Sequence, residues 1–379
     1  MAFEFATATR IVFGAGVRRE AAGAAAALGR RALLVTGGTP ERVSGCLAGI
    51  PVVPFAVAGE PAIDTIRRGV ALARAEGCDV VVAIGGGSAI DAGKALAALL
   101  TNSGDPLEYL EVIGRGRPLE RAPAPFIAIP TTAGTGSEVT RNAVLGSPEH
   151  RVKASLRSER MLPRLALVDP ELALGLPPAV TASTGLDALT QVIEPYVSLR
   201  ANAMTDLFCV EGTRRAGRAL PRAWENGADL EARTDMAWAA LLGGLALANA
   251  GLGAVYGFAA PIGGMFPAPH GAVCAALLPH AMAINVEALR ARDAGGAALA
   301  RYEEVARMLT GRPQATADDG LDWVAALCRK LEIPPLRTYG IRDTDIPALV
   351  EKAARASSMK GNPIALDGAE LREIVARAL

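Results

Sequence analysis

The chain has 379 residues. A domain with a single hydrophobic core is usually shorter, so this length favours two domains. Lysine plus arginine and aspartate plus glutamate number 39 each, so the charge balance argues against nucleic acid or an anionic membrane as a partner. The five cysteines are odd in number and never spaced C-x-x-C, which argues against a disulfide framework and a zinc knuckle. We interpret them as small buried side chains of a protein in the reducing cytoplasm.

The first half of the chain alternates between apolar runs and helical patterns. The N-terminus lacks a basic start before an apolar stretch, so no signal peptide is expected, and no apolar run reaches membrane-spanning length. Strands are expected over residues 3–13 (or a hairpin), 31–36, 52–57, 79–84, 125–129 and 165–168, and helices over residues 18–28 and 62–75. This alternation predicts an open, mostly parallel α/β sheet.

The stretch from Cys78 to Lys94 is the most informative of the first half. An apolar run over residues 79–84 indicates a buried parallel strand, and the glycines that follow allow a tight turn. Ser88 is expected to cap a helix over residues 89–100, whose N-terminal N–H groups would suit a phosphate. Ile90 stands where G-x-G-x-x-G has its third glycine, and an ordinary glycine-rich turn is the alternative. Lys94 is expected to face solvent or the phosphate loop.

Three loops rich in glycine or threonine follow three expected strands: VTGGT, IGGGS and IPTTAGTGSE. In open α/β sheets, ligands bind beyond the carboxyl ends of the strands. Three such loops at one edge of a sheet favour a nucleotide site over the alternative of long solvated loops.

The second half of the chain changes character near Thr181. Alanine- and leucine-rich segments with charged faces predict helices over residues 187–197, 203–220, 230–247, 298–309, 322–331, 346–356 and 368–379. The stretch PELALGLPP, residues 170–178, is a plausible hinge. We therefore expect an α/β dinucleotide-binding domain over residues 1–178 and an all-helical domain over residues 179–379, with the active site in the cleft that they form.

Five motifs, in order along nearly the whole chain, resemble the iron-containing (group III) alcohol dehydrogenase family: GGGSAIDAGK, IPTTAGTGSEVT, GLDALTQVIEPYVS, GGMFPAPHG and LLPH. The resemblance implies hydride transfer between a nicotinamide cofactor, NAD(P)(H), and an alcohol or carbonyl carbon. The expected cofactor-binding residues, from the loops and from the resemblance, are Gly37, Gly38, Thr39, Gly86, Gly87, Ser88, Asp91, Thr131, Thr132, Thr135, Ser137 and Lys153. No carboxylate follows VTGGT before Glu41, so NADPH is expected to be accepted at least as well as NADH.

The resemblance also implies a metal site of one aspartate and three histidines. The corresponding positions here are Asp187, Gln191, Tyr256 and His270, and a further family histidine falls on Ala260. A glutamine amide is a weak ligand for Fe(II) or Zn(II), and a tyrosine must ionise from a pKa of ~10 to bind well. We therefore expect a degenerate site that holds iron or zinc weakly or not at all.

Each of these residues also has a structural alternative. Asp187 could cap its helix, His270 could be a turn residue, and Tyr256 could be a core aromatic. His280 is expected to pack at the end of the LLPH helix.

The sequence therefore predicts an NAD(P)-dependent alcohol dehydrogenase or carbonyl reductase, in which Tyr256 and His270 act as catalytic hydrogen-bond donors. A maleylacetate reductase-like enzyme is one alternative, and a nucleotide-binding protein without catalysis is another. The expected partners are a small alcohol or carbonyl substrate and further copies of the chain in a homodimer or higher homo-oligomer, with neither nucleic acid nor membrane.

Overall fold

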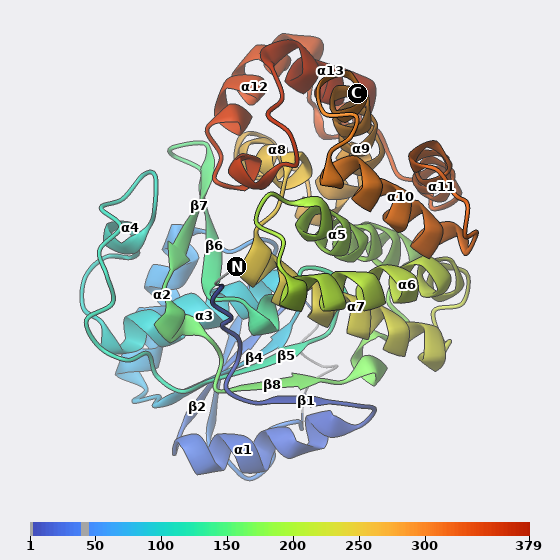
Figure 1. Ribbon diagram of the computed structural model, residues 1–379. Coiled ribbons are helices and arrows are strands. Elements are labelled where there is room, and N and C mark those ends of the chain that lie inside the picture. The colour runs from blue at the N-terminus through green and yellow to red at the C-terminus, as the bar shows by residue number, and fades with distance from the viewer. Residues whose placement is uncertain (1–2, 39–44) are drawn as a thin grey trace. The chain divides into compact units, whose positions relative to one another are not determined.

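The computed structural model describes residues 3–38 and 45–379 (Figure 1). The chain forms two compact units. The sheet unit comprises Phe5–Thr132 and Gly136–Ala173, and the helical unit comprises Leu174–Leu379, Ala133–Thr135 and the described residues before Phe5. The predicted boundary between residues 178 and 179 falls at the start of the long helix α5 (Pro178–Val197).

The sheet unit contains a six-stranded sheet in the order β1-β8-β5-β4-β2-β3. Every pairing in it is parallel, which confirms the predicted α/β class. Its strands are β1 (Ile11–Phe13), β2 (Ala32–Thr36), β3 (Val52–Ala56), β4 (Val80–Gly85), β5 (Phe126–Pro130) and β8 (Leu165–Val168). The helices of this unit are α1 (Ala21–Leu28), α2 (Ile63–Ala75), α3 (Gly87–Thr101) and α4 (Pro106–Tyr109).

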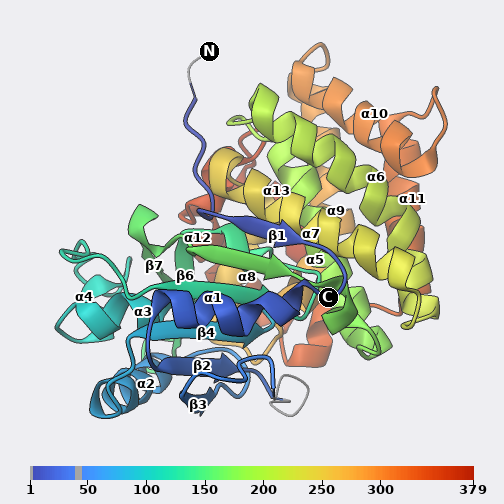
Figure 2. The ribbon, with the colours of Figure 1, turned by 90° about the horizontal axis from the view of Figure 1, so that it is seen from below.

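The central strand β4 is buried along its whole length, and its side chains alternate between two apolar cores. Val81 and Ala83 pack with residues of α2 and α3. Val80, Val82 and Ile84 pack on the other face, where α1 lies (Figure 2). Helices on both faces explain why this strand is an unbroken apolar run rather than an alternating one.

A two-stranded antiparallel sheet was not predicted. Strands β6 (Asn142–Ser147) and β7 (Val152–Arg157) pair with each other, and α3 packs against β6. At the N-terminus the predicted strand over residues 3–13 is wrong in extent, because only Ile11–Phe13 is a strand. The helix predicted over residues 18–28 begins later, at Ala21, because Val17–Glu20 form a 3₁₀ turn.

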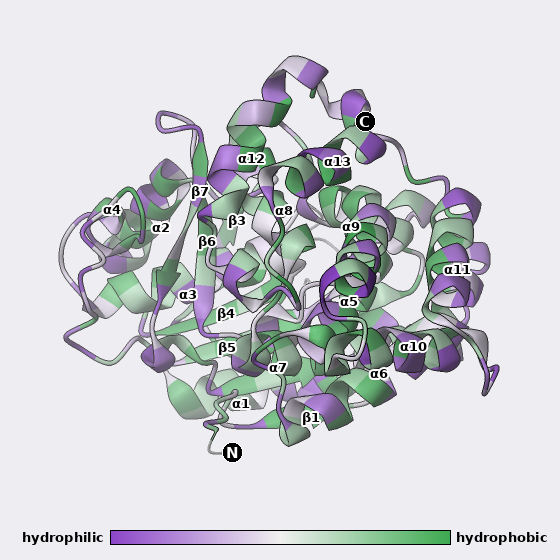
Figure 3. Ribbon diagram, turned by 45° about the horizontal axis from the view of Figure 1, so that its top comes forward, coloured by the Kyte–Doolittle hydropathy of each residue, from purple (hydrophilic) through white to green (hydrophobic). Residues whose placement is uncertain are grey.

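The helical unit is built from nine α-helices among its described residues. They are α5, α6 (Ala203–Glu225), α7 (Leu230–Ala250), α8 (Ala254–Met265), α9 (His270–Arg292), α10 (Ala297–Thr310), α11 (Ala317–Lys330), α12 (Ile346–Ala354) and α13 (Gly368–Ala378). Figure 3 shows hydrophilic residues interspersed with hydrophobic ones along α11, as expected for a helix with one solvent-facing side. The predicted all-α class of this half is confirmed.

Helix α9 is long and apolar enough to span a membrane by composition, and α7 with α8 passes the same test as a pair bent by 97°. Within its most apolar window, however, 78% of α9 is buried inside the protein. Burial of that extent is typical of the core helix of a folded domain. His280 lies in the middle of α9, so the prediction that it packs at a helix end is wrong.

Candidate functional site

The glycine loop of the sheet unit joins β4 directly to α3. Gly86 is the N-cap of α3 and has φ −73° and ψ −175°, with no side chain capping the helix. Ser88 lies inside the first turn, so its predicted role as N-cap is wrong. Gly86, Gly87 and Ser88 remain partly exposed, and the first N–H groups of an α-helix have no partner within the helix. Such a terminus suits a phosphate group.

Two further predicted loops meet this glycine loop. The strands β2, β4 and β5 are neighbours, so their carboxyl ends share one edge of the sheet. A Cβ added to Gly85 would lie 3.2 Å from the N of Gly37, and one added to Gly86 would lie 3.4 Å from the Thr132 Oγ1. Thr131 N donates to Gly85 O at 2.9 Å. The structure therefore brings together the loops that carry Gly37, Gly86 and Thr132.

The other predicted cofactor residues have varied surroundings. Gly38 is exposed, and Thr39 lies outside the described residues. Ser137 is buried in a 3₁₀ turn (Ser137–Val139), whereas Thr135 belongs to the helical unit. Lys153, on β7, forms an ion pair with Glu60. Their roles toward a cofactor stay predictions.

Asp91 and Lys94 connect α3 to the β6–β7 sheet. The Asp91 Oδ2 accepts from Val144 N at 3.0 Å, and its Oδ1 lies 3.1 Å from Lys94 Nζ. Lys94 Nζ also donates to Thr140 Oγ1 at 2.8 Å and to the carbonyl of Asn142. The expectation that Lys94 faces solvent or the phosphate loop is wrong, because only 1% of the residue is exposed. Burial lowers the pKa of its amine, and the charge of Asp91 opposes this shift.

In the helical unit, three predicted site residues meet. Asp187 lies in the middle of α5, which excludes the alternative of an N-terminal cap. The Tyr256 hydroxyl, from α8, donates a hydrogen bond to Asp187 Oδ1. His270 is the first residue of α9, and its Nε2 lies 3.7 Å from the same oxygen. The rings of Tyr256 and His270 meet edge to face with centroids 5.1 Å apart.

The electrostatics of this cluster keep the proton on Tyr256. Burial raises the pKa of Asp187, while the charge of His270 and the hydrogen bond from Tyr256 lower it. Burial and the neighbouring Asp187 raise the pKa of Tyr256 well above its ordinary value. Tyr256 is thus a hydrogen-bond donor rather than a phenolate.

Gln191, the fourth predicted metal position, is buried one helical turn after Asp187. Its Nε2 donates to Gly134 O at 2.9 Å. Its Oε1 has no hydrogen-bond partner in the described part of the chain. A buried amide oxygen without a partner is uncommon in native proteins and is able to accept from a ligand.

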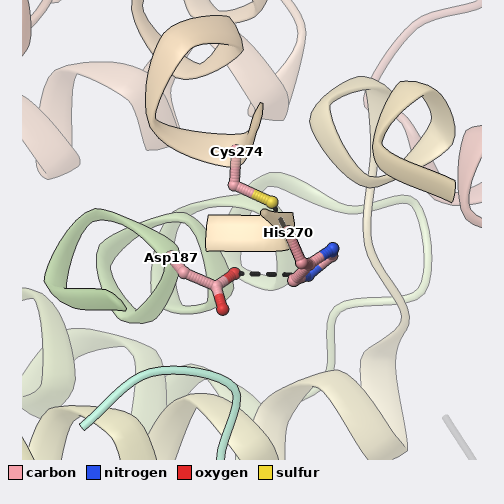
Figure 4. A group of neighbouring side chains, drawn as sticks. All are labelled: Asp187, His270 and Cys274. Carbon is pink, nitrogen blue, oxygen red and sulfur yellow. Dashed lines mark hydrogen bonds and ion pairs between the residues drawn. The ribbon is translucent and has the colours of Figure 1, made fainter. Parts of the chain in front are cut away.

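Cys274, which was not predicted as a site residue, lies beside this cluster. Its Sγ is 3.7 Å from His270 Nε2, and the donor atoms of Asp187, His270 and Cys274 all lie within 4.8 Å of one another (Figure 4). The signal was present in the spacing, because residues four apart on a helix share a face and His270 and Cys274 both lie on α9. The sequence predicts only a small buried side chain at Cys274.

The start of α8, which carries Tyr256, is held by two buried polar side chains. Glu194 accepts from Gly253 N at 2.9 Å and from Val255 N at 2.7 Å. Asn362 Oδ1 accepts from Ala254 N at 3.0 Å. Burial raises the pKa of Glu194 to about 7. These bonds satisfy the first N–H groups of α8 and fix the position of Tyr256.

Comparison with known proteins identifies the family. Residues 8–170 match the model of iron-containing alcohol dehydrogenases, and residues 181–379 match the C-terminal model of the same family. The chain belongs to the iron-containing alcohol dehydrogenase family. It is an NAD(P)-dependent oxidoreductase that interconverts an alcohol and its carbonyl compound.

Several relatives are similar over most of the chain. Alcohol dehydrogenase 4 of Schizosaccharomyces pombe is 38% identical over 320 residues, which cover 84% of this chain and 73% of that protein. The solved structure of a 1,3-propanediol oxidoreductase has a TM-score of 0.91 and 34% identity, with both chains covered in full. A sulfoacetaldehyde reductase from Bifidobacterium kashiwanohense, solved with NAD+, has a TM-score of 0.87 and 28% identity, covering 100% of this chain and 99% of that one.

Proposed function

We propose that the substrate is a small aldehyde or ketone, or the matching alcohol, and that its reacting oxygen binds at Asp187, Tyr256 and His270. The observation that carries this proposal is the meeting of these three side chains, in which Tyr256 donates to the buried Asp187 carboxylate and the His270 Nε2 lies 3.7 Å from the same oxygen. The relative named for 1,3-propanediol supports a small alcohol as substrate.

In reduction, the carbonyl carbon accepts a hydride from the nicotinamide and the oxygen accepts a proton. Tyr256 and His270 are the donors that stabilise the charge developing on that oxygen. Asp187 orients both donors, because each approaches the same carboxylate oxygen. Glu194 and Asn362 act indirectly, by holding the helix that carries Tyr256.

The proposed cofactor site lies at the carboxyl edge of the parallel sheet. Gly86, Gly87 and Ser88 would receive the pyrophosphate at the N-terminus of α3, with Thr131 and Thr132 beside them. The nucleotide-facing roles of Gly37, Gly38, Thr39, Asp91, Thr135, Ser137 and Lys153 belong to the same proposal. We further propose that NADPH is accepted at least as well as NADH.

The family's iron does not fit the four corresponding positions. Tyr256 keeps its proton and directs its hydroxyl to Asp187, and the Nε2 of Gln191 is bound to Gly134. Only Asp187 and His270 remain as good ligands for Fe(II), and two protein ligands are too few for tight binding. We propose that the purified protein holds little iron.

We also propose that the protein is cytoplasmic and assembles as a homodimer or higher homo-oligomer. The proposed division between its two domains lies between residues 178 and 179.

Steady-state oxidation of NADH and NADPH against a panel of small aldehydes and ketones tests the proposed substrate class. Turnover confined to maleylacetate would favour the maleylacetate reductase alternative. Cofactor binding without turnover on any carbonyl or alcohol would overturn the proposal in favour of a non-catalytic nucleotide-binding protein.

A further inference from the structure

We propose that Asp187, His270 and Cys274 form a thiolate-containing site for a divalent metal of the zinc type. This inference rests on the proposed function, because it concerns the same cluster. Cys274 supplies a third donor, whereas the family's pattern has two histidines at the positions of Gln191 and Tyr256. The site would therefore differ from the family's set of one aspartate and three histidines in ligands and in metal preference.

The spacing of the donor atoms is the first argument. Zinc binds sulfur at ~2.3 Å and nitrogen or oxygen at ~2.0–2.2 Å in tetrahedral geometry, which places neighbouring ligand atoms about 3.3–3.6 Å apart. The His270 Nε2 lies 3.7 Å from Asp187 Oδ1 and 3.7 Å from Cys274 Sγ. Shifts of a few tenths of an ångström would bring these two pairs to ligand spacing, and the donor atoms of the third pair, Asp187 and Cys274, lie within 4.8 Å of each other.

The local structure holds these donors in place. His270 and Cys274 lie four residues apart on α9 and so share one face of the helix, which presents nitrogen and sulfur together (Figure 4). Asp187 approaches from the buried face of α5. Two rigid helices of one compact unit thus supply all three donors, so little ordering is required on binding.

Charge balance is the second argument. Asp187 is 2% exposed, and a carboxylate this deeply buried is costly without compensation. A divalent cation with one carboxylate, one thiolate and one neutral imidazole has zero net charge. On binding, the thiol proton leaves to solvent, and no oxidation or reduction takes place.

Gln191 supplies an independent sign of a missing partner. Its side chain is fully buried, and its Oε1 has no hydrogen-bond partner in the described part of the chain. It lies one helical turn from Asp187. A metal-bound water beside the three ligands would offer this oxygen a donor, and catalytic zinc sites keep such an open position.

The ligand types set the metal preference. Soft thiolate ligands select zinc over iron, and zinc also stands above Fe(II) in the general order of divalent affinities. With a metal bound, His270 would be one of its ligands, and Tyr256 would be the remaining proton donor of the cluster. In the metal-free form both are donors, as proposed above.

Metal content and cobalt spectroscopy test the inference. Protein produced with zinc and iron both supplied should contain about one zinc per chain and little iron by elemental analysis. After exchange of zinc for Co(II), we expect a thiolate-to-cobalt charge-transfer band in the near ultraviolet. Cys274→Ser should abolish this band and weaken zinc binding by ~100-fold or more, since even outer partners of a metal site contribute 10–100-fold.

Cys209→Ser is the matched control. Cys209 and Cys274 are both 0% exposed in the helical unit, and Cys209 lies on α6, outside the cluster. This control should keep the band. Far-ultraviolet circular dichroism and nicotinamide-nucleotide titration check the fold of each variant, and Cys274→Ala is a second variant if the serine form is unstable.

Two results would overturn the inference. One is a wild-type Co(II) spectrum without a thiolate band, which needs no variant. The other is a band that persists in Cys274→Ser. Carbonyl reduction by a protein without the band would leave the proposed function standing. A clear band with no turnover on any carbonyl would instead refute the proposed function and leave the metal site.

Discussion

The Tyr256 hydroxyl donates a hydrogen bond to Asp187, and this contact joins α8 to the middle of α5. Tyr256→Phe removes the donor and leaves the aromatic ring. We expect kcat for carbonyl reduction to fall by ~100-fold, in the range of one general acid or hydrogen-bond donor, with little change in cofactor affinity. Tyr302→Phe is the control, because Tyr302 is a buried tyrosine of the same unit and its hydroxyl meets Asn285 instead. An equal fall in kcat in both variants would show that the effect comes from altered packing and not from the lost donor at Tyr256.

Gly86→Val tests the proposed pyrophosphate site. The backbone angles of Gly86 are ordinary, and a Cβ there would meet Thr132 only at ordinary contact distances of 3.4 Å and 3.5 Å. The fold should therefore survive, while the larger side chain covers the N-terminus of α3. We expect the Kd for NAD(P)H to rise at least ~10-fold, or ~1.4 kcal/mol, in fluorescence titration. Gly23→Ala, on α1 with open space around it, should leave the Kd unchanged.

Gly38→Asp tests the proposed cofactor preference. A Cβ on Gly38 would meet nothing within 4 Å, so the backbone has room for a side chain. A carboxylate near the ribose repels the 2′-phosphate of NADPH and accepts a hydrogen bond from the 2′-hydroxyl of NADH. We expect kcat/KM for NADPH to fall about tenfold, or ~1.4 kcal/mol, while kcat/KM for NADH stays the same. A wild-type enzyme that strongly prefers NADH in parallel assays would contradict the prediction.

Gln191→His combined with Tyr256→His restores imidazole at both family positions. With Asp187 and His270 these side chains complete the family's four ligands, so bound iron should rise from a minor fraction toward one per chain. Elemental analysis after purification with iron supplied is the measurement. Wild-type protein that already holds one iron per chain would show that the two natural residues do not impair iron binding.

Glu138 predicts a pH dependence of stability in the sheet unit. Burial raises its pKa to about 7, and the charge of Lys94 opposes this shift. Because the unfolded carboxyl titrates near ~4.3, the native state binds more protons between that pH and 7. The contribution of Glu138 to the free energy of unfolding is therefore fully present below this pH range and is lost as the pH rises to 7. Its magnitude is on the order of 3 kcal/mol.

Glu138→Gln should flatten this dependence, which thermal unfolding at pH 5 and pH 8 would measure. The exposed Glu149, in the turn between β6 and β7, provides the control as Glu149→Gln. A wild-type pH profile that is unaltered in Glu138→Gln would assign the titration to another group.

The parallel sheet and its glycine loop could be predicted from the sequence because their signals are local. An apolar run that enters three glycines has few structural solutions, and β4 with α3 adopts the expected one. The hairpin of β6 and β7 gave no such signal. Its strands alternate buried and partly buried residues of modest hydrophobicity, and they form a sheet with each other rather than joining the six-stranded sheet.

The candidate site was predicted in part. Asp187, Tyr256 and His270 came from motif positions, and the structure brings them together. Cys274 was missed because a cysteine in an apolar helix is usually a core residue, and only packing of α9 against α5 shows which donors it meets. The burial of Lys94 was missed for a similar reason, since its partners Thr140 and Asn142 are remote in sequence.

The burial of Lys94 makes its amine a chemical reporter of the sheet unit. Acylating reagents need an accessible, deprotonated amine, and Lys94 Nζ is enclosed by α3, Thr140 and the start of β6. Exposed lysines such as Lys352 should acylate at once. Acylation of Lys94 requires that β6 separate from α3, so its rate in mass spectrometry measures how often this part of the native protein opens.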